Sequence, residues 1–321
     1  MKVAKVDKNL IKEIIDCLPK ERTLFRYFKD RYAFLLLQHL VGEGESVSTI
    51  RKSAYSPLLE KPAMKHALAL AGRGIITPKI LNSVWPGDTY NFLLTLGTWG
   101  SNCHRWDQTT RRGYNLVLQL NFSNQHDGIY KKMVKPEYEL LLNSCGHPVL
   151  EPEDRAYFRE TLSWARIDLD FQKDEALIEE VQCDWLREAK YLLRDARWYK
   201  KQKRKIADWW GTGGDLDEII KYCEEILLPY NQIWSEAMLA ATIDFIRCEL
   251  GVKNIYYHTE NTGHRLKSIK YRKPPRSIYS QLPKKFCFSE SDEAPSFLYD
   301  DKYFRRIYNK VENPKWYKLT I

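Results

Sequence analysis

The chain lacks the cysteine and hydrophobic patterns that mark secreted, zinc-binding and membrane proteins. Its 321 residues include seven cysteines, an odd number, and no C-x-x-C pair. This argues against a disulfide framework and against a zinc-finger spacing. The longest apolar runs, such as Ala33–Leu37, are far too short to cross a bilayer, and residues 1–15 contain no signal-peptide core. We therefore expect a cytoplasmic protein with no membrane partner.

Several well-known catalytic motifs are also missing. The sequence contains no Walker loop, no G-x-G-x-x-G, no H-E-x-x-H and no Ser–His–Asp order. The glycine-rich segment 211–214 is most simply a turn between two helices, although such a segment can also bend around a phosphate. His258 ends an expected strand, where we predict a satisfied surface residue rather than a catalyst.

The composition is that of a folded, basic protein. Hydrophobic residues make up 44% of the chain and aromatic residues 13%, whereas disordered chains are poor in aromatics. The formal net charge is +9, which favours acidic partners such as nucleic acid or a nucleotide-containing cofactor. The oligomeric state is left open.

Apolar periodicity predicts a mostly helical N-terminal region, residues 1–113. Helical spacing recurs over residues 8–41, around Met64–Ala71 and around Tyr90–Leu96. Glycine- and proline-containing turns separate these segments.

Residues 114–321 are expected to form an α/β domain. Asn115–Phe122 alternates like a strand, and a helix is expected at Pro136–Leu142. Ser163–Phe171 and Glu175–Cys183 are predicted to form a hairpin. A basic helical insertion, about residues 185–230, follows it.

The last part of the chain continues the α/β pattern. Trp234–Leu250 is predicted to be a helix that stops at Gly251, followed by a strand at Val252–Thr259. A short helix is expected at Ser277–Lys284, and a strand-rich tail over the last thirty residues. The predicted fold class is therefore α/β (mixed α+β), with a mixed sheet and packed helices.

The end of the second hairpin strand is unusually polar. Glu179, Glu180, Gln182 and Asp184 follow one another closely and lead to Trp185. Burying unpaired polar groups is costly, so this acidic cluster is either paired with basic groups or used on a ligand.

Three interpretations of the acidic cluster are open. Asp168 and Asp170 on the first strand, with Glu180 on the second, have the oxygen ligands that suit Mg²⁺. Alternatively, Glu180 is a general base beside a substrate amine. The third interpretation is a structural network in which Arg166 pairs with Glu180 across the hairpin.

A basic stripe runs along the predicted helix after the hairpin. Its members recur at steps of three and four: Arg187, Lys190, Arg194, Arg197, Lys201 and Arg204. Such a stripe can neutralise the phosphates of nucleic acid or of a cofactor, or it can be the solvated face of an ordinary amphipathic helix.

Residues 163–186 resemble a segment of large polyvalent proteins of phages and mobile elements. There a strand similar to His-Val-Arg-Phe precedes Phe-Ile-Glu-Glu-Ile-Gln-Ser-Asp-Trp; here Trp-Ala-Arg-Ile-Asp leads to Leu-Ile-Glu-Glu-Val-Gln-Cys-Asp-Trp. The resemblance continues at Trp234–Ile246, Lys253–Thr259 and Tyr279–Phe286. It implies a connection with phages or mobile elements but no particular activity.

The order of the expected elements also resembles the acyltransferase superfamily called GNAT. In that fold a hairpin leads to a strand, a helix whose start holds the CoA pyrophosphate, another strand, a short helix and a final hairpin. Asp170–Gln182, Trp234–Leu250, Val252–Thr259 and Ser277–Phe288 match most of these elements. The Arg/Gln-x-x-Gly-x-Gly/Ala loop of that superfamily has no counterpart, since Trp185–Lys190 contains no glycine.

The GNAT resemblance implies an acyltransferase-like protein that uses acetyl-CoA or another acyl-CoA. Glu180 would be the general base, Gln182 and Asp184 would orient the substrate, and Asp168 completes the candidate catalytic set. The basic stripe and Tyr279 would contact the cofactor or nucleic acid.

Restriction-type nucleases have a similar order of residues, with Asp on one strand and Glu-x-Lys on the next. Asp168 or Asp170 with Glu180-Val-Gln182 resembles that motif, Gln replacing Lys, and implies a Mg²⁺-dependent nuclease. The third hypothesis is a non-enzymatic nucleic-acid-binding or interaction protein. The acyltransferase-like protein is the leading hypothesis.

Overall fold

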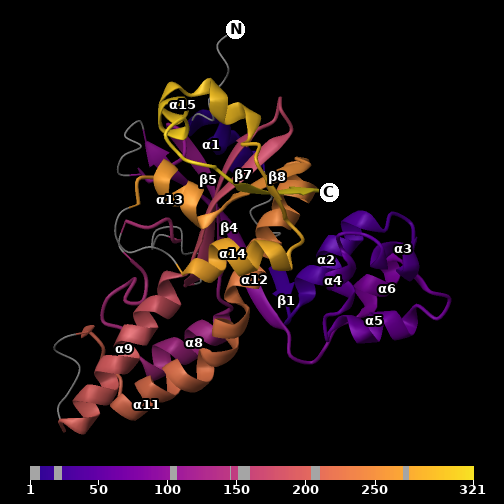
Figure 1. The fold of residues 1–321 in the computed structure, drawn as a ribbon. Coiled ribbons are helices and arrows are strands. Elements are labelled where there is room, and N and C mark those ends of the chain that lie inside the picture. The colour runs from indigo at the N-terminus through magenta and orange to yellow at the C-terminus, as the bar shows by residue number, and fades with distance from the viewer. Residues whose placement is uncertain are drawn as a thin grey trace.

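A large mixed sheet lies at the centre of the protein, with helices packed around it (Figure 1). The structure is a computed structural model that describes residues 8–17, 24–101, 107–144, 146–150, 160–203, 210–269 and 275–321. The sheet has eight strands in the order β1-β4-β5-β6-β7-β8-β10-β9. They are β1 (Leu24–Tyr27), β4 (Tyr90–Ser101), β5 (Gly113–Asn121), β6 (Thr161–Asp170), β7 (Glu175–Gln182), β8 (Asn254–His258), β9 (Ser289–Ser291) and β10 (Trp316–Thr320). Strands β7 and β8 are parallel, and the other neighbours are antiparallel.

Helix α1 (Lys8–Cys17) packs against β4 and β5. Five other helices of the described N-terminal region lie beside one end of the sheet: α2 (Arg31–Leu40), α3 (Val47–Arg51), α4 (Ser56–Leu59), α5 (Met64–Leu70) and α6 (Pro78–Ser83), with a small pair of strands, β2 (Glu45–Ser46) and β3 (Ile75–Ile76). At the start of α6, the side chain of Thr77 accepts a hydrogen bond from the amide of Ile80, and Pro78 occupies the first helical position. Both features are common at helix starts. Figure 1 shows α2 to α6 grouped next to β1.

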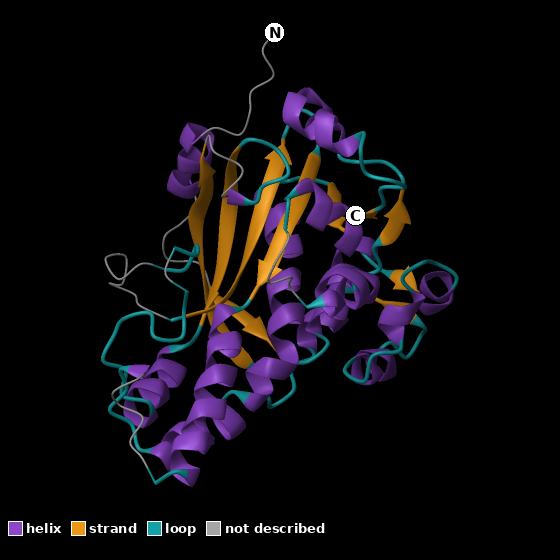
Figure 2. Cartoon of the chain, turned by 60° about the vertical axis from the view of Figure 1, so that its left-hand side comes forward, coloured by secondary structure: helices purple, strands orange, loops and turns teal. Residues whose placement is uncertain are grey.

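A second group of helices packs into the same apolar cluster as α2 and lies away from α2 to α6 in Figure 1. It contains α8 (Asn124–Met133), α9 (Asp184–Lys201), α11 (Leu216–Lys221) and the π-helical turn η2 (Tyr222–Ile226). The long helix α12 (Leu228–Asp244) and the π-helical turn η3 (Phe245–Glu249) lead from this group to β8. Figure 2 shows these helices gathered below the strands.

Helix α12 is apolar on nearly every side because it is enclosed by other elements. Nine of its residues, from Ile233 to Ile243, are buried, and it packs against β6, β7 and α2. A helix that is hydrophobic all round is expected in the interior of a protein. Alternate residues of β6, such as Ala165 and Ile167, belong to the same apolar cluster.

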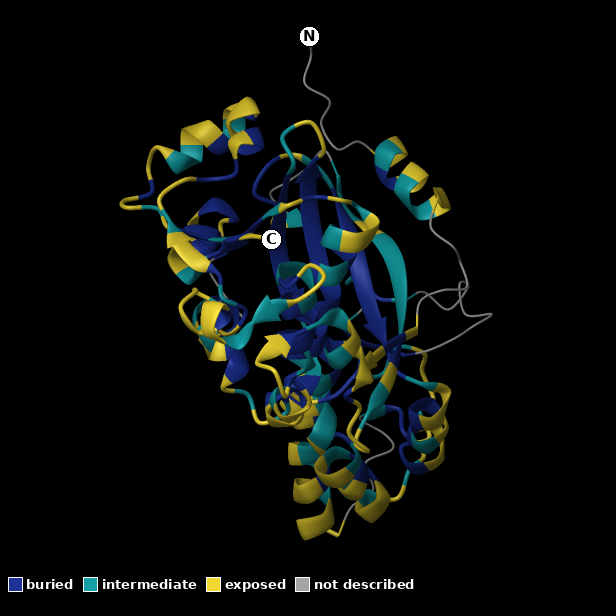
Figure 3. Ribbon diagram, turned by 90° about the vertical axis from the view of Figure 1, so that its right-hand side faces the viewer, coloured by how far each residue is buried: buried dark blue, intermediate teal, exposed yellow. Residues whose placement is uncertain are grey.

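The other face of the sheet carries α13 (Glu260–Leu266), the 3-10 turn η4 (Ser296–Asp300) and α15 (Lys302–Tyr308). Helix α14 (Arg276–Lys285) lies on the first face, where it packs against α12. A separate apolar cluster joins Leu177 of β7 and Trp316 of β10 to Phe297 and Phe304. The central strands are therefore buried on both faces, dark blue in Figure 3.

The predicted mixed α/β fold class is confirmed, and so are the hairpin of β6 and β7, the helix α12 and the strand β8. The predicted helix at Tyr90–Leu96 is wrong, because these residues lie in β4. This strand pairs with both β1 and β5. The N-terminal region 1–113 thus contributes two strands to the sheet of residues 114–321.

Two further local predictions are wrong. Pro136–Leu142 forms a bridge and turns rather than a helix, and α8 precedes it. The tail is not strand-rich, since η4 and α15 lie between β9 and β10. In the described part of the chain, no helix has both the length and the apolar character needed to cross a membrane.

Candidate functional site

The candidate site lies where β7 and β8 stop pairing. Their parallel register runs from Glu175 opposite Asn254 to Ile178 opposite Tyr257. On the other side of β7, Arg166 lies opposite Glu180 and Ile167 lies opposite Ile178, so Glu179 is an extra residue in the strand. Such a β-bulge bends a strand and redirects its side chains. Here the bulge coincides with the end of the β7–β8 pairing.

Side chains replace the missing backbone ladder at this point. Lys267 Nζ donates to the carbonyl oxygen of Glu179 over 2.7 Å. The Glu179 carboxylate accepts from the amide of Thr110 (2.9 Å) and from its hydroxyl (2.7 Å), and lies 3.1 Å from Nε2 of His258. All four residues are buried. Burial opposes the charge of Glu179, but the His258 hydrogen bond and the charges of Lys267 and Arg166 outweigh it and lower the pKa of Glu179 to about 2.

Glu180 forms a buried ion pair with Arg166 across the hairpin. This pairing is the structural network considered as the third interpretation of the acidic cluster. Burial raises the pKa of Glu180, but the charges of Arg166 and Lys267 outweigh it, so that its pKa lies below the ordinary value. Arg166 also donates to the carbonyl of Asp107 (2.7 Å). This hydrogen bond holds the segment before β5 against the Arg166–Glu180 ion pair.

Asp168 is held by a different arginine. Arg111 Nε and Nη2 donate to its two carboxylate oxygens over 2.7 and 2.8 Å, a bidentate geometry that leaves little acceptor capacity. Asp170 accepts the amide of Lys173 in the hairpin turn (3.1 Å). Within the described residues, Asp168, Asp170 and Glu180 do not form a group that could hold a metal ion.

Asp184 lies at the first turn of α9 and is surrounded by donors. Its carboxylate accepts from Nε1 of Trp164 (3.1 Å), Nε2 of Gln182 (2.7 Å) and Nη2 of Arg187 (2.5 Å), and lies 2.8 Å from Nδ1 of His147. Burial raises its pKa, but the His147 hydrogen bond and these other partners outweigh it and lower the pKa overall. Gln182 and Asp184 thus form a network that fixes the start of α9.

Tyr279 lies on the wall of a pocket of about 900 Å³. The pocket opens between α13, α14 and β10, and its other lining residues include Thr259, His264, Arg265, Lys310 and Tyr317. The Tyr279 side chain is 2% exposed, and its hydroxyl has no hydrogen-bond partner among the described residues. Its ring centroid lies 5.8 Å from Lys267 Nζ, so Tyr279 connects the pocket with the site between β7 and β8.

The basic stripe on α9 is largely paired with acidic side chains. Arg194 pairs with Asp195 over 2.8 Å, Arg197 pairs with Glu224, and Arg187 is held by Asp184 and Glu188. Lys190 and Lys201 are exposed, and neither forms an ion pair with another described residue. Arg204 lies outside the described residues.

The glycine-rich segment 211–214 is closed against the chain after α8. Glu137 donates its amide to the carbonyl of Gly211 (2.8 Å), and Gly213 donates to Lys135 (3.0 Å). Thr212 pairs with Pro136 in an isolated antiparallel bridge, so this segment is engaged with the chain after α8 and is not the simple turn expected from its sequence.

Sequence patterns did not identify His258, Lys267, Thr110 and Arg111 as members of the site. His258 was predicted to lie at the surface, and it is fully buried. Lys267 and Thr110 lie in segments with polar, loop-like composition, where long-range contacts leave no periodic signal. The only signal was the cluster of carboxylates on β7, which required basic or hydrogen-bonding partners from elsewhere in the chain.

Comparisons of this chain with models of protein families, with curated proteins and with solved structures find no match.

Proposed function

We propose that this protein is an acyltransferase-like protein of the GNAT type, connected with phages or mobile elements. Its ligand binds in the pocket lined by Tyr279. The proposal rests on the order of the elements, on the end of the β7–β8 pairing, and on the hydroxyl of Tyr279.

The order of elements supports this proposal. The hairpin β6–β7 leads to α9, then to α12 and to β8, which is parallel to β7. Short helices α13 and α14 follow, and β9 pairs with β10 at the end. This is the succession on which the GNAT resemblance was based, with the pair α9–α11 as an insertion.

The buried hydroxyl of Tyr279 is the observation that carries the proposed binding site. Burial, followed by the charge of Glu180, raises the pKa of Tyr279 well above its usual value, so the hydroxyl keeps its proton at neutral pH. A buried donor without a partner costs about 1 to 3 kcal/mol. Tyr279 lines the pocket, so a ligand that reached this hydroxyl would supply the missing acceptor.

The charge of the pocket favours an anionic ligand. Arg265 and Lys310 line it, and neither forms an ion pair with another residue of the described chain. Two other cations of the lining are compensated, because Arg276 pairs with Glu260 over 3.0 Å and Lys315 pairs with Asp292.

The start of α9 does not fit the pyrophosphate of CoA. A pyrophosphate at a helix start needs free backbone amides and no competing negative charge. Here the buried carboxylate of Asp184 lies in the first turn. His147 contacts this carboxylate, and Ser144 accepts a hydrogen bond from Arg187, so both residues lie over the start of the helix. Anion recognition is therefore assigned to the pocket at Tyr279.

Glu180 acts as a positioning residue in this proposal rather than as a general base. A base works best when its pKa lies near the working pH, and the pKa of Glu180 is shifted the other way. Its pair with Arg166 holds the bulged end of β7 in place beside Tyr279.

Calorimetric titration with acetyl-CoA, with and without Mg²⁺, tests the proposal. We expect saturable binding that needs no metal. Tyr279→Phe should weaken it by about fivefold to tenfold, the effect of one lost hydrogen bond. Tyr191→Phe on the exposed face of α9 is the matched control and should leave the affinity unchanged.

No detectable heat with the wild-type protein would remove acetyl-CoA as the ligand. Equal affinities of the wild type and Tyr279→Phe would remove the proposed pocket, even if acetyl-CoA binds.

The two other hypotheses have less geometric support. A Mg²⁺-dependent nuclease would use Asp168, Asp170 and Glu180, yet Asp168 and Glu180 are engaged by separate arginines. A nucleic-acid-binding protein would use the basic stripe, whose arginines Arg187, Arg194 and Arg197 are paired. Plasmid cleavage with Mg²⁺ and the salt dependence of DNA binding test these alternatives.

A further inference from the structure

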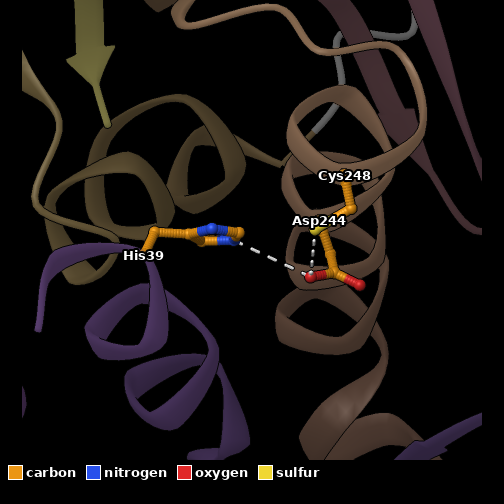
Figure 4. A group of neighbouring side chains, drawn as sticks. All are labelled: His39, Asp244 and Cys248. Atoms are coloured by element: carbon orange, nitrogen blue, oxygen red, sulfur yellow. Dashed lines mark hydrogen bonds and ion pairs between the residues drawn. The ribbon is translucent and has the colours of Figure 1, made fainter. Parts of the chain in front are cut away.

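Three side chains with metal-binding chemistry meet between two helices, away from the pocket. His39 lies near the end of α2, Asp244 is the last residue of α12, and Cys248 lies one turn later in η3 (Figure 4). Nε2 of His39 lies 3.8 Å from Oδ1 of Asp244, and Sγ of Cys248 lies 3.6 Å from the same oxygen. All three ligand atoms lie within 4.8 Å of one another.

These distances suit a tetrahedral ion. Zinc binds nitrogen and oxygen at about 2.0–2.2 Å and thiolate sulfur at about 2.3 Å, so two of its ligand atoms lie roughly 3.3–3.8 Å apart. The His39–Asp244 and Cys248–Asp244 separations already fall in or near this range. Only a small approach of Cys248 and His39 is needed for all three to bind one ion.

The donor set selects the kind of metal. One imidazole nitrogen, one carboxylate oxygen and one thiolate sulfur form a mixed set that suits zinc and the neighbouring divalent transition metals better than Ca²⁺ or Mg²⁺. The carboxylate and the thiolate together balance the charge of a divalent ion.

The surroundings leave the carboxylate available to an ion. In the described part of the chain, His39 is the ion-pair partner of Asp244. The guanidinium of Arg31 feels the charge of Asp244 but lies over the ring of Trp85 at 4.3 Å and forms no ion pair with Asp244 among the described residues. Arg247 donates to the carbonyl of Val252 (3.2 Å). Cys248 is exposed, so water reaches the open side of the group.

We propose that His39, Asp244 and Cys248, with a water molecule as the fourth ligand, form a zinc site. On binding, the thiol of Cys248 releases its proton to the solvent and the sulfur binds the ion. The ion joins α2 to the end of α12, and thus ties the N-terminal helices to the helix beneath the sheet.

Titration with Co²⁺, which takes the same ligands as zinc and absorbs visible light, tests the site at constant pH. We expect one ion per chain, tetrahedral visible bands, and a sulfur-to-cobalt charge-transfer band that zinc abolishes. Cys248→Ser should remove the charge-transfer band and weaken binding by at least about tenfold. His39→Gln should weaken binding similarly but keep a weaker sulfur band.

Cys17→Ser is the matched control, because Cys17 is also an exposed free cysteine and does not belong to the group. It should leave both spectrum and affinity unchanged. The proposal is overturned if the wild-type chain shows no saturable binding, or if the charge-transfer band survives in Cys248→Ser. Should Cys248→Ser fail to fold, unchanged binding by His39→Gln would overturn it equally.

Discussion

Glu179 and His258 face each other across two strands that no longer pair, with 3.1 Å between Oε2 and Nε2 and both side chains fully buried. The contact exists because the bulge at Glu179 places an extra side chain in β7, beyond the last β7–β8 pair. A side-chain hydrogen bond thus connects β7 and β8 beyond their last backbone pair.

Stability should fall in acid because of Glu179. The pKa of Glu179 in the folded protein is about 2, below its usual 4.5. The contribution of Glu179 to the free energy of unfolding is therefore fully present above about pH 4.5. It is lost as the pH falls towards 2, and the loss is at most about 3 kcal/mol. Urea unfolding as a function of pH measures this loss. Glu179→Gln should show a shallower dependence in this window, and identical slopes would contradict the assignment.

Breaking the Arg166–Glu180 pair should be strongly destabilising. Arg166→Met leaves the buried carboxylate of Glu180 without its cation, which costs about 3 to 5 kcal/mol. Denaturant unfolding measures the loss. Arg197→Ala, which removes the exposed pair with Glu224, should cost less than about 1 kcal/mol. Equal effects of the two substitutions would show that the buried pair has no special role.

Tyr222 should anchor the tryptophan that follows the acidic cluster. Its hydroxyl accepts from Nε1 of the buried Trp185 over 2.9 Å and lies 3.1 Å from Nε2 of His126. Tyr222→Phe removes only this oxygen and should lower the free energy of unfolding by about 1 to 3 kcal/mol. Tyr191→Phe on the surface of α9 should be neutral, and a neutral Tyr222→Phe would mean that water replaces the lost hydroxyl.

Two adjacent glycines should respond differently to the same substitution. A Cβ on Gly214 would lie 2.5 Å from the carbonyl oxygen of Met133, whereas a Cβ on Gly213 meets nothing closer than 3.8 Å. Gly214→Ala must displace backbone and should cost about 1 to 3 kcal/mol. Gly213→Ala should be close to neutral. Thermal unfolding of both variants checks this order, and the reverse order would contradict the packing of this segment.

Local signals predicted the elements with strong periodicity or clear ends. Trp234–Leu250 and the hairpin before it have the apolar patterns expected of an enclosed helix and of central strands. Tyr90–Leu96 carries no clear strand pattern, because most of its residues are half-buried and their burial does not alternate. Tertiary pairing with β1 and β5 decided its structure.

The candidate site was predictable only in part. The carboxylates at Glu179 and Glu180 signalled that partners exist, and the Arg166–Glu180 pair follows from hairpin register. The partners from distant segments, Lys267 and His258, depend on a bulge and on the end of a parallel ladder. Neither the bulge nor the end of the ladder can be predicted from the local sequence.

The position of β10 has a consequence for the order of folding during synthesis. Strand β10 lies between β8 and β9, although both of these leave the ribosome before it. Until residues 316–320 emerge, β8 presents an open edge to solvent and β9 has no neighbour to pair with. Open strand edges invite association between chains. A nascent chain that pauses before residue 316 should therefore depend on chaperones more than the finished protein does.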